Sequence, residues 1–408
     1  MNALAPGCAV DGTSSPIRVV YLFGTAVIKG GGEVSLLELM SEIRHLGVDP
    51  IGVVDGPGEI QERLEAEGIR CIQQAVPPLR PWRILSCLRA YRALKQNLAE
   101  LDATLLHANG ARIMLYAGLA GRSLGIPCIW HVRVLDRDPF LDRVRGWLAD
   151  RIIANAASTR QSLQALIRDS VRIVQIYNGI RLETCQGAPD HAMGRKPNTP
   201  PLILAVGRLS REKGYEDLLD ACALLKQAGT AFNVRIIGNA PSADPAYADA
   251  LRHRCDMLGL ADHIAFAGWV QDVGTRMRQA DVLVLPSRRE AFGRVIVEAW
   301  AAGLPVIATR SGGPDELIQD GETGRLVPVK APECLATAIQ RLLADSAQQE
   351  KFRQAGYRKA GEFSLAEHAR KVFSLYKVML LEAARPPRLP APDLPTASES
   401  ALDDARSG

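Results

Sequence analysis

Short apolar runs alternate with longer amphipathic stretches along this chain. In the first half of the sequence the runs are IRVVYLF, IGVV, TLLHA, CIWHV and RIIAN, which start at residues 17, 51, 104, 128 and 151. Helical patterns separate the first of them, over residues 33–45 and 59–67. Runs that are apolar at nearly every position are typical of parallel strands buried on both faces. The alternation predicts a doubly wound α/β domain over residues 17–182.

Residues 183–201 interrupt this pattern with polar, Gly and Pro residues, and we interpret them as an interdomain linker. The pattern resumes with LILAVG, NVRIIG, IAFAG, DVLVLP, PVIAT and RLVPV, which predicts a second doubly wound domain over residues 202–362. A helical pattern predicts a terminal helix within residues 363–384. We expect residues 1–16 to form a disordered leader and residues 385–408, rich in Pro, Ala, Ser and Asp, to form a disordered tail.

Composition narrows the class of protein. The 408 residues are 47% hydrophobic and 23% charged, which is typical of a globular protein and excludes a fibrous or disordered chain. A net charge of +4, spread along the chain, does not indicate a nucleic-acid partner. The eight cysteines are widely scattered, and no signal-like or membrane-spanning apolar run is present. We therefore expect a cytoplasmic protein.

The most informative motif directly follows the apolar run DVLVLP. It reads SRREAFGRVIVEAWAAGLP and places Glu290 and Glu298 eight residues apart. We expect Glu290 in a loop and a helix from about Arg294, whose N-terminus would face the cleft between the two sheets. A carboxylate accepts two hydroxyl groups, so this pair can hold the diols of a hexose and a ribose. Taken singly, each carboxylate could also be an ordinary helix charge.

The motif resembles the E-x7-E donor-site motif of the retaining GT-B glycosyltransferases in glycosyltransferase family 4. GRLSREKG, RIIGNAP, FAGWVQDV, SGGPDELI and DGETGRLVP follow the order of that family, and YNGI at residues 177–180 resembles its domain-boundary motif. These segments cover most of residues 175–345. The resemblance implies a GT-B fold with two Rossmann-like domains, an N-terminal acceptor domain, a C-terminal nucleotide-sugar domain and a final helix that returns to the first domain.

The resemblance also implies roles for individual residues. Arg208 and Lys213 would neutralise the diphosphate, Glu290 would bind hydroxyl groups of the sugar, and Glu298 would bind the ribose. His131, at the end of the run CIWHV, would hydrogen-bond to the sugar. The residues implied in catalysis are Glu290, His131, Arg208 and Lys213. The residues implied in donor binding are Gly31, Gly32, Arg208, Lys213, Gly238, Val270, Glu290, Ala291, Phe292, Gly293, Val295 and Glu298.

Two further motifs suggest other functions. Gly30, Gly31 and Gly32 lie between the first strand and a helix, and Asp55 ends the second strand, as in a dinucleotide oxidoreductase; the spacing is not G-x-G-x-x-G, however, and this interpretation explains nothing in the second domain. Asp136-Arg137-Asp138 is a D-x-D triplet of the kind that binds a divalent metal in glycosyltransferases of the other main fold. We interpret it as coincidental, and we expect no metal and no cofactor.

A cationic segment is the last feature. Residues 68–99 contain no acidic residue but six basic ones, Arg70, Arg80, Arg83, Arg89, Arg92 and Lys95. One helical face, formed by Ile84, Cys87, Leu88, Tyr91, Leu94 and Leu98, is predicted to pack on the domain. The segment is either an ordinary helix with a solvated basic face, or a docking site for an anionic membrane surface through residues 80–95.

The resemblance therefore implies a retaining glycosyltransferase that moves a hexose-type sugar from a nucleoside-diphosphate sugar to a glycan or lipid-linked acceptor in cell-surface polysaccharide or glycolipid synthesis. No enzymic nucleophile is evident, so we hypothesise a same-face transfer assisted by the leaving phosphate. The alternatives are a non-catalytic protein that binds sugar nucleotides and a nucleotide-sugar epimerase on the same fold. Localisation would be cytoplasmic, with peripheral association at the inner face of the membrane as a hypothesis.

Overall fold

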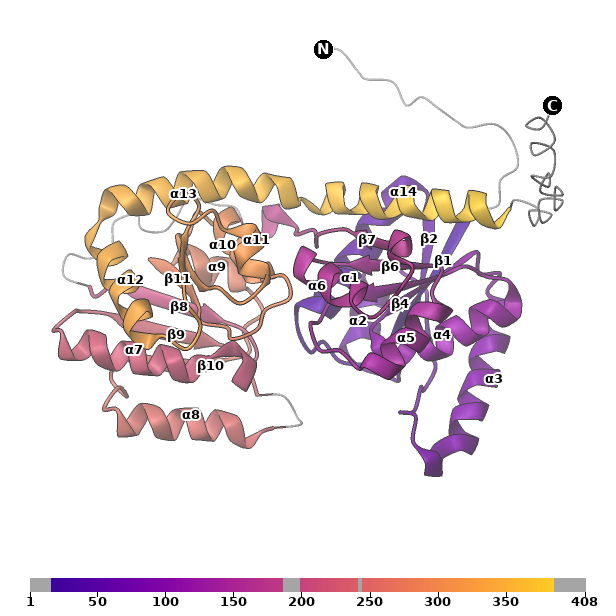
Figure 1. Ribbon diagram of the computed structural model, residues 1–408, viewed down its shortest axis with the longest axis horizontal. Helices are drawn as coiled ribbons and strands as arrows, with labels where there is room; N and C mark the ends of the chain where they lie inside the picture. The colour runs from indigo at the N-terminus through magenta and orange to yellow at the C-terminus, as the bar shows by residue number, and fades with distance from the viewer. Residues whose placement is uncertain (1–15, 186–198, 241–243, 385–408) are drawn as a thin grey trace, which may run out of the picture.

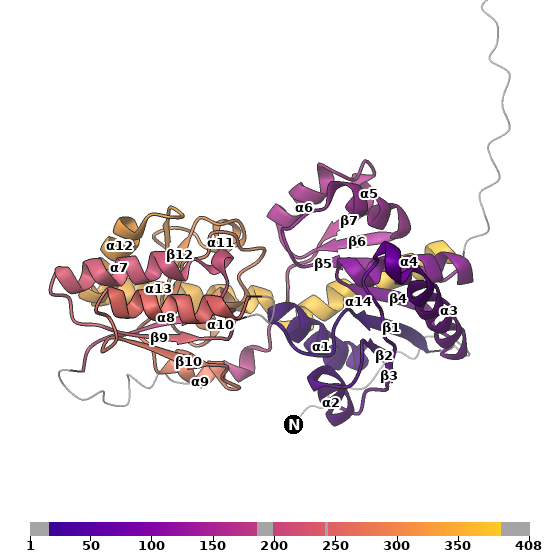
Figure 2. The ribbon, with the colours of Figure 1, turned by 90° about the horizontal axis from the view of Figure 1, so that it is seen from below.

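The computed structural model describes residues 16–185, 199–240 and 244–384. Two parallel β-sheets organise these residues, and helices cover both faces of each sheet (Figures 1 and 2). The predicted disordered tail, nearly all of the predicted leader and most of the predicted linker lie outside the described residues.

The N-terminal sheet has seven strands among the described residues, in the order β3-β2-β1-β4-β5-β6-β7. Its strands are β1 Ile17–Phe23, β2 Val48–Val54, β3 Cys71–Gln73, β4 Leu105–Asn109, β5 Cys128–Val132, β6 Arg151–Ala154 and β7 Ile173–Gln175. Its helices are α1 Gly31–Ile43, α2 Glu59–Ala66, α3 Ile84–Glu100, α4 Ala111–Leu124, α5 Pro139–Leu148 and α6 Ala157–Gln164. Apolar side chains of α1 and α2 pack on one face of the sheet, and those of α3 and α4 pack on the other.

The C-terminal sheet has the order β10-β9-β8-β11-β12-β13. Its strands are β8 Leu202–Val206, β9 Asn233–Ile237, β10 Ile264–Gly268, β11 Val282–Leu285, β12 Val306–Thr309 and β13 Arg325–Val327. Its helices are α7 Tyr215–Gln227, α8 Ala246–Met257, α9 Val273–Arg278, α10 Arg294–Ala301, α11 Gly313–Leu317, α12 Pro332–Ala344 and α13 Ser346–Ala360. In each sheet the strand order reverses beside the first strand, β1 or β8, which opens a crevice at the carboxyl ends of the strands.

The chain passes between the domains at two adjacent segments. Ile180 donates its N–H to the carbonyl of Phe363 at 2.9 Å, and Leu365 donates to the carbonyl of Ile180 at 3.0 Å. Helix α14, Leu365–Ala383, then runs along the N-terminal domain, where Val372 and Tyr376 share a core with β1 and α1 (Figure 1). No helix among the described residues has the length and apolar composition needed to cross a bilayer.

The structure corrects the predicted buried face of α3. Cys87, Leu94 and Leu98 are buried as predicted, and Ala90 joins them. Ile84 and Leu88, however, are 62% and 46% exposed. The buried positions follow the spacing of the turns that pack on α4, whereas the first turn of α3 extends beyond the body of the domain (Figure 1).

Candidate functional site

The loop between β11 and α10 carries Glu290, as predicted from the motif. Two backbone hydrogen bonds fix this loop, from the N–H of Glu290 to the carbonyl of Ser311 at 2.9 Å and from the N–H of Gly313 to the carbonyl of Glu290 at 2.8 Å. Gly293, with φ of 88°, is the N-cap of α10, a conformation that favours glycine. The positive end of the helix dipole thus lies three residues after the carboxylate.

Glu290 and Lys213 are in direct contact. The Glu290 carboxylate binds the Lys213 ammonium through Oε2 and also accepts a hydrogen bond from the Ser287 hydroxyl at 3.2 Å. Their side chains are only 13% and 18% exposed. The loop from β8 to α7 and the loop from β11 to α10 therefore meet at a charge pair, which brings together two of the predicted site residues.

Three consecutive glycines lie beside three arginines, of which Arg208 and Arg294 belong to the second domain and Arg133 to the first. A Cβ atom at Gly30 would lie 4.0 Å from Cδ of Arg208, one at Gly31 would lie 3.3 Å from Cδ of Arg294, and one at Gly32 would lie 3.4 Å from Cδ of Arg133. Gly30 is the N-cap of α1, and the predicted donor-site residues Gly31 and Gly32 lie in its first turn. Only at Gly31 would a side chain lie closer than ordinary contact distance, so this glycine permits the close approach of Arg294 from the other domain.

Arg208, which the sequence predicts to bind a diphosphate, is exposed. Within residues 16–185, 199–240 and 244–384, no carboxylate forms an ion pair with it. It lies in the loop that also carries Lys213, beside the N-terminus of α1. An exposed cation near a helix N-terminus favours an anionic ligand.

Arg294 joins the two domains, a role that the sequence did not reveal. Its guanidinium donates to Glu38 of α1 at 2.7 and 3.0 Å, to the Ser35 hydroxyl at 3.0 Å and to Glu298 at 2.6 Å. Burial lowers the pKa of Arg294, but the two carboxylates outweigh that effect and leave the pKa raised. The predicted ribose ligand Glu298 is therefore part of an ion bridge between the domains.

Arg133 is a second arginine that sequence reasoning missed, and its partners carry no charge. It donates to Oδ1 of Asn109 at 2.9 Å, to Oδ1 of Asn178 and to Nδ1 of His131 at 3.3 Å. Among the described residues it forms no ion pair. Burial lowers the pKa of Arg133 to about 9, and nearby Arg294 contributes to the lowering. This cation is charged at neutral pH but is not neutralised by a contacting carboxylate.

His131 is the second-last residue of β5, close to the predicted strand end, but it is completely buried. Its Nδ1 lies 3.0 Å from Nε2 of His107, whose Nδ1 lies 2.6 Å from the Tyr376 hydroxyl. Burial, with the charge of Arg133, lowers the pKa of both histidines, so they are neutral at pH 7. Nε2 of His131 has no hydrogen-bond partner among the described residues. In this arrangement a sugar would reach His131 only after side chains around it move.

Both acidic residues of the D-x-D triplet have structural partners. Asp138 caps the N-terminus of α5 by accepting from the N–H of Leu141 at 3.0 Å. Asp136 pairs with Arg289 of the other domain at 2.8 Å. Another interdomain contact is close by, where Glu316 accepts from the N–H groups of Ala157 and Ser158 at the start of α6, both at 2.7 Å. The triplet thus has a role in capping and domain contact.

The remaining predicted donor-site residues surround the same crevice. Phe292 is buried, with its ring 5.9 Å from the rings of both Tyr177 and Phe363. A Cβ atom at Gly238 would lie 2.0 Å from the carbonyl oxygen of Gly207, so glycine is needed where these two loops touch. Three other residues are partly buried: Val270, Ala291 and Val295.

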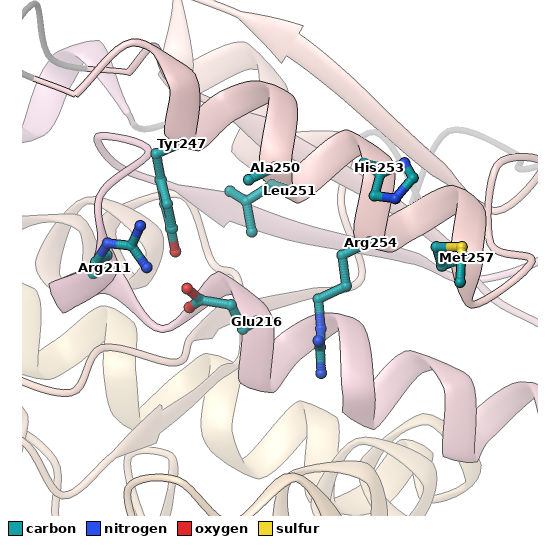
Figure 3. A pocket seen from close by; sticks show the side chains of 8 residues that line it. All are labelled: Arg211, Glu216, Tyr247, Ala250, Leu251, His253, Arg254 and Met257. Atoms are coloured by element: carbon teal, nitrogen blue, oxygen red, sulfur yellow. The ribbon is translucent and has the colours of Figure 1, made fainter.

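Two pockets lie near these loops. One, of about 450 Å³, lies between the domains and includes Ser158, Gly312 and Glu316. The other, of about 420 Å³, lies between α7 and α8 and is lined by Arg211, Glu216, Tyr247, Ala250, Leu251, His253, Arg254 and Met257 (Figure 3). It contains none of the predicted donor-site residues, although Arg211 belongs to the same loop as Lys213.

Two family models match the chain in succession. Residues 29–184 match the model described as Glycosyltransferase Family 4, and residues 189–359 match the model described as Glycosyl transferases group 1. The boundary between the two matches falls between the domains seen in the structure.

Relatives of the chain include the lipopolysaccharide core biosynthesis glycosyltransferase LpsE of Rhizobium meliloti, which is 30% identical over 217 residues, or 53% of this chain and 60% of that protein. The glycogen synthase of Mycobacterium tuberculosis is 31% identical over 300 residues, or 71% of this chain and 67% of that protein. The chain therefore spans less than two thirds of the length of LpsE.

Solved structures include Anabaena Alr3699/HepE in complex with UDP and glucose, which has a TM-score of 0.79 and 22% identity. The alignment covers 88% of this chain and 99% of that one. At this identity the likeness concerns the fold, which is the two-domain GT-B architecture expected from the sequence.

Proposed function

The chain belongs to glycosyltransferase family 4, and from this premise we propose that it transfers a hexose from a nucleoside-diphosphate sugar to a glycan or lipid-linked acceptor with retention of anomeric configuration. The relative LpsE, named for lipopolysaccharide core biosynthesis, supports an acceptor in cell-surface polysaccharide or glycolipid synthesis. We place the reaction in the cytoplasm.

One observation carries the proposal: a cation and a carboxylate of the second domain pair between two loops, and arginines of the same domain lie beside the glycine run of the first. Lys213 and Glu290 touch, and Arg208 lies beside Gly30. Cations at a helix N-terminus stabilise the charge that develops on a leaving diphosphate. A carboxylate beside them can accept hydroxyl groups of the sugar.

In the proposed step the bond between C1 of the sugar and the β-phosphate oxygen breaks, and a bond from C1 to the acceptor oxygen forms on the same face. The proton of the acceptor hydroxyl goes to an oxygen of the departing diphosphate. Arg208 and Lys213 stabilise that diphosphate, and its arrival would compete with Glu290 for the Lys213 ammonium. Glu290 is then released to bind sugar hydroxyls, and Glu298 binds the ribose.

Arg133 adds a cation to this arrangement from the first domain. Its contacts are neutral, and it lies beside Gly32 in the first turn of α1. A cation without a contacting carboxylate is suited to an anion that arrives with the ligand. We assign Arg133 to the phosphoryl oxygens of the bound donor.

The test is donor hydrolysis and transfer with UDP, GDP and ADP sugars, with UDP-glucose first because a protein of the same fold binds UDP and glucose. Lys213→Ala and Glu290→Ala should each lower the rate by a factor of about 100 or more while circular dichroism shows intact folding. The control is Lys226→Ala, because the Lys226 ammonium binds the carbonyl of Gly259, away from these loops.

Three outcomes would contradict the proposal. Wild-type rates in Lys213→Ala and Glu290→Ala would remove the assigned site. Binding of nucleoside diphosphates without turnover of any donor would favour a non-catalytic protein, and conversion of the donor sugar without an acceptor would favour an epimerase. Product with inverted configuration in an NMR spectrum would contradict retention.

A further inference from the structure

The segment between β3 and α3 exposes a cluster of apolar side chains. These side chains and their exposed fractions are Leu79 at 54%, Trp82 at 74%, Ile84 at 62%, Leu85 at 68% and Leu88 at 46%. They come from the short 3-10 helix Pro81–Arg83, the residues before it and the first turns of α3. Figure 1 shows this end of α3 projecting beyond the other helices of the domain. Large contiguous apolar patches on a protein surface indicate an interaction site.

The same surface is strongly cationic. No acidic residue occurs between Glu67 and Glu100. Four arginines are exposed around the apolar cluster: Arg80, Arg83, Arg89 and Arg92. The guanidinium of Arg80 lies 5.4 Å from the centroid of the Trp82 ring. An apolar tip surrounded by arginines, with an exposed tryptophan, is typical of a surface that lies at a membrane interface.

This projecting segment is firmly attached to the domain. Val76 donates its N–H to Asp55 at 2.7 Å, and Asp55 is fixed by an ion pair with Arg112 at 2.6 Å. The Tyr116 hydroxyl donates to the carbonyl of Pro77 at 2.8 Å. Asp55, which could have suggested a dinucleotide site, thus anchors the segment. The residues that lead into the apolar cluster are therefore held against the domain.

We propose that this surface, formed by Leu79, Arg80, Trp82, Arg83, Ile84, Leu85, Leu88, Arg89 and Arg92, docks on an anionic lipid bilayer. The apolar side chains enter the interface while the arginines contact lipid phosphates. Charge complementarity favours this partner, because the cluster combines several exposed cations with no carboxylate. The docking uses no donor-site residue, so it stands or falls independently of the proposed activity.

The experiment is co-sedimentation of the full chain with two kinds of vesicle, phosphatidylcholine alone and phosphatidylcholine mixed with phosphatidylglycerol. We expect binding to the mixed vesicles only, weakened by salt. Each arginine near an anionic surface contributes about a fivefold change in partitioning. Arg89→Gln with Arg92→Gln should therefore weaken binding about 25-fold, and Trp82→Ser with Leu85→Ser should weaken it by about tenfold or more.

Matched controls lie in the C-terminal domain. Met257 is as exposed as Trp82, at 74%, so Met257→Ser controls for the loss of an exposed apolar side chain. Arg341 and Arg358 are exposed residues of α12 and α13, so Arg341→Gln with Arg358→Gln controls for the loss of charge. Both controls should bind vesicles like the wild type, and all variants should hydrolyse soluble donor at the wild-type rate.

Several results would overturn the docking proposal. If the variants and their controls lose vesicle binding to the same extent, then binding does not depend on this particular surface. Equal binding to both kinds of vesicle, without salt dependence, would exclude the cationic contribution. If the wild type binds neither vesicle but self-associates, and Trp82→Ser with Leu85→Ser abolishes that association, the partner is a second copy of the chain.

Discussion

Two arginines lie beside adjacent glycines, and replacing each by a neutral residue should change the free energy of unfolding in opposite directions. Arg133 beside Gly32 contacts only neutral groups, whereas Arg294 beside Gly31 lies between two carboxylates. We predict that Arg133→Gln raises the free energy of unfolding of the ligand-free protein, while Arg294→Gln lowers it. Both variants should lose transfer activity, because each removes a cation from the crevice.

The pKa of Arg133 gives the size of the stability change expected for Arg133→Gln. The pKa of about 9, well below the ordinary value of an arginine, corresponds to at most about 5 kcal/mol acting against the charged form. The three hydrogen bonds lost in Arg133→Gln offset about 1 kcal/mol each, and solvent at the partly exposed side chain reduces the remainder. The net gain is about 1 kcal/mol. The gain is expected at neutral pH, where Arg133 is charged in both the folded and the unfolded chain.

Arg294→Gln should cost about 3 kcal/mol, because it leaves Glu38 and Glu298 close together with side chains only 7% and 19% exposed. Urea denaturation followed by circular dichroism measures both changes. Arg160→Gln, at an exposed position of α6, controls for the loss of a surface arginine. If Arg133→Gln lowers stability as much as Arg294→Gln does, the charge of Arg133 is compensated in the folded protein and our interpretation is wrong.

Three further predictions concern metal, backbone and pH. Transfer should be unchanged by EDTA, and restoration of activity by Mg²⁺ or Mn²⁺ after chelation would contradict this. Gly238→Ala should lower the melting temperature well beyond Gly229→Ala, because a Cβ atom at Gly238 would lie 2.0 Å from a carbonyl oxygen whereas at Gly229 it meets nothing within 4 Å. Burial lowers the pKa of His107, His131 and His368, the last to about 3, so the free energy of unfolding should fall as pH drops below 6.5. A His368→Asn variant with an unchanged slope of stability against pH would contradict this assignment.

Much of the fold follows from local patterns in the sequence. The run IRVVYLF became β1 at Ile17–Phe23, and LILAVG became β8 at Leu202–Val206, because apolar β-branched runs are stable only between two layers of helices. The first residue of α1 was harder to predict from the sequence. Its first residues, Gly31 and Gly32, are poor helix formers, so the pattern indicated a helix from residue 33. Tertiary contacts with the arginines explain why glycine lies there.

The exposed side chains at the start of α3 show a second feature that hydrophobic periodicity does not predict, which is the burial of each residue. Ile84 and Leu88 fall on the same helical face as the buried Cys87 and Leu94, so the sequence predicted burial for all four. Periodicity gives the direction of a side chain but not how far the neighbouring helix extends. Cys87 still reaches the core, but Ile84 and Leu88 lie where the neighbouring helix does not cover them, so part of the predicted apolar face is exposed.

The site shows which contacts a motif can and cannot reveal. Glu290 and Lys213 were expected to share a site because each belongs to a recognisable segment. The partner of Arg294, however, is Glu38, 256 residues away and outside every motif. Arg133 also lies outside every motif, and it is distinguished only by the neutral side chains that contact it. Neutral contacts around this partly buried cation can be seen only once Asn109 and Asn178 are placed next to it.

The Arg294 bridge connects the two halves of the proposed mechanism. Oε1 of Glu298 accepts from Arg294 at 2.6 Å, and the same guanidinium holds Glu38 of the first domain. A ribose diol that hydrogen-bonds to Glu298 withdraws electron density from the carboxylate that Arg294 binds, so it alters the contact between the domains. If donor binding changes the free energy of the contact between α1 and α10, then by thermodynamic reciprocity forming that contact changes the free energy of donor binding by the same amount. Donor binding and domain closure are therefore expected to be coupled through one side chain, which the E-x7-E spacing alone does not reveal.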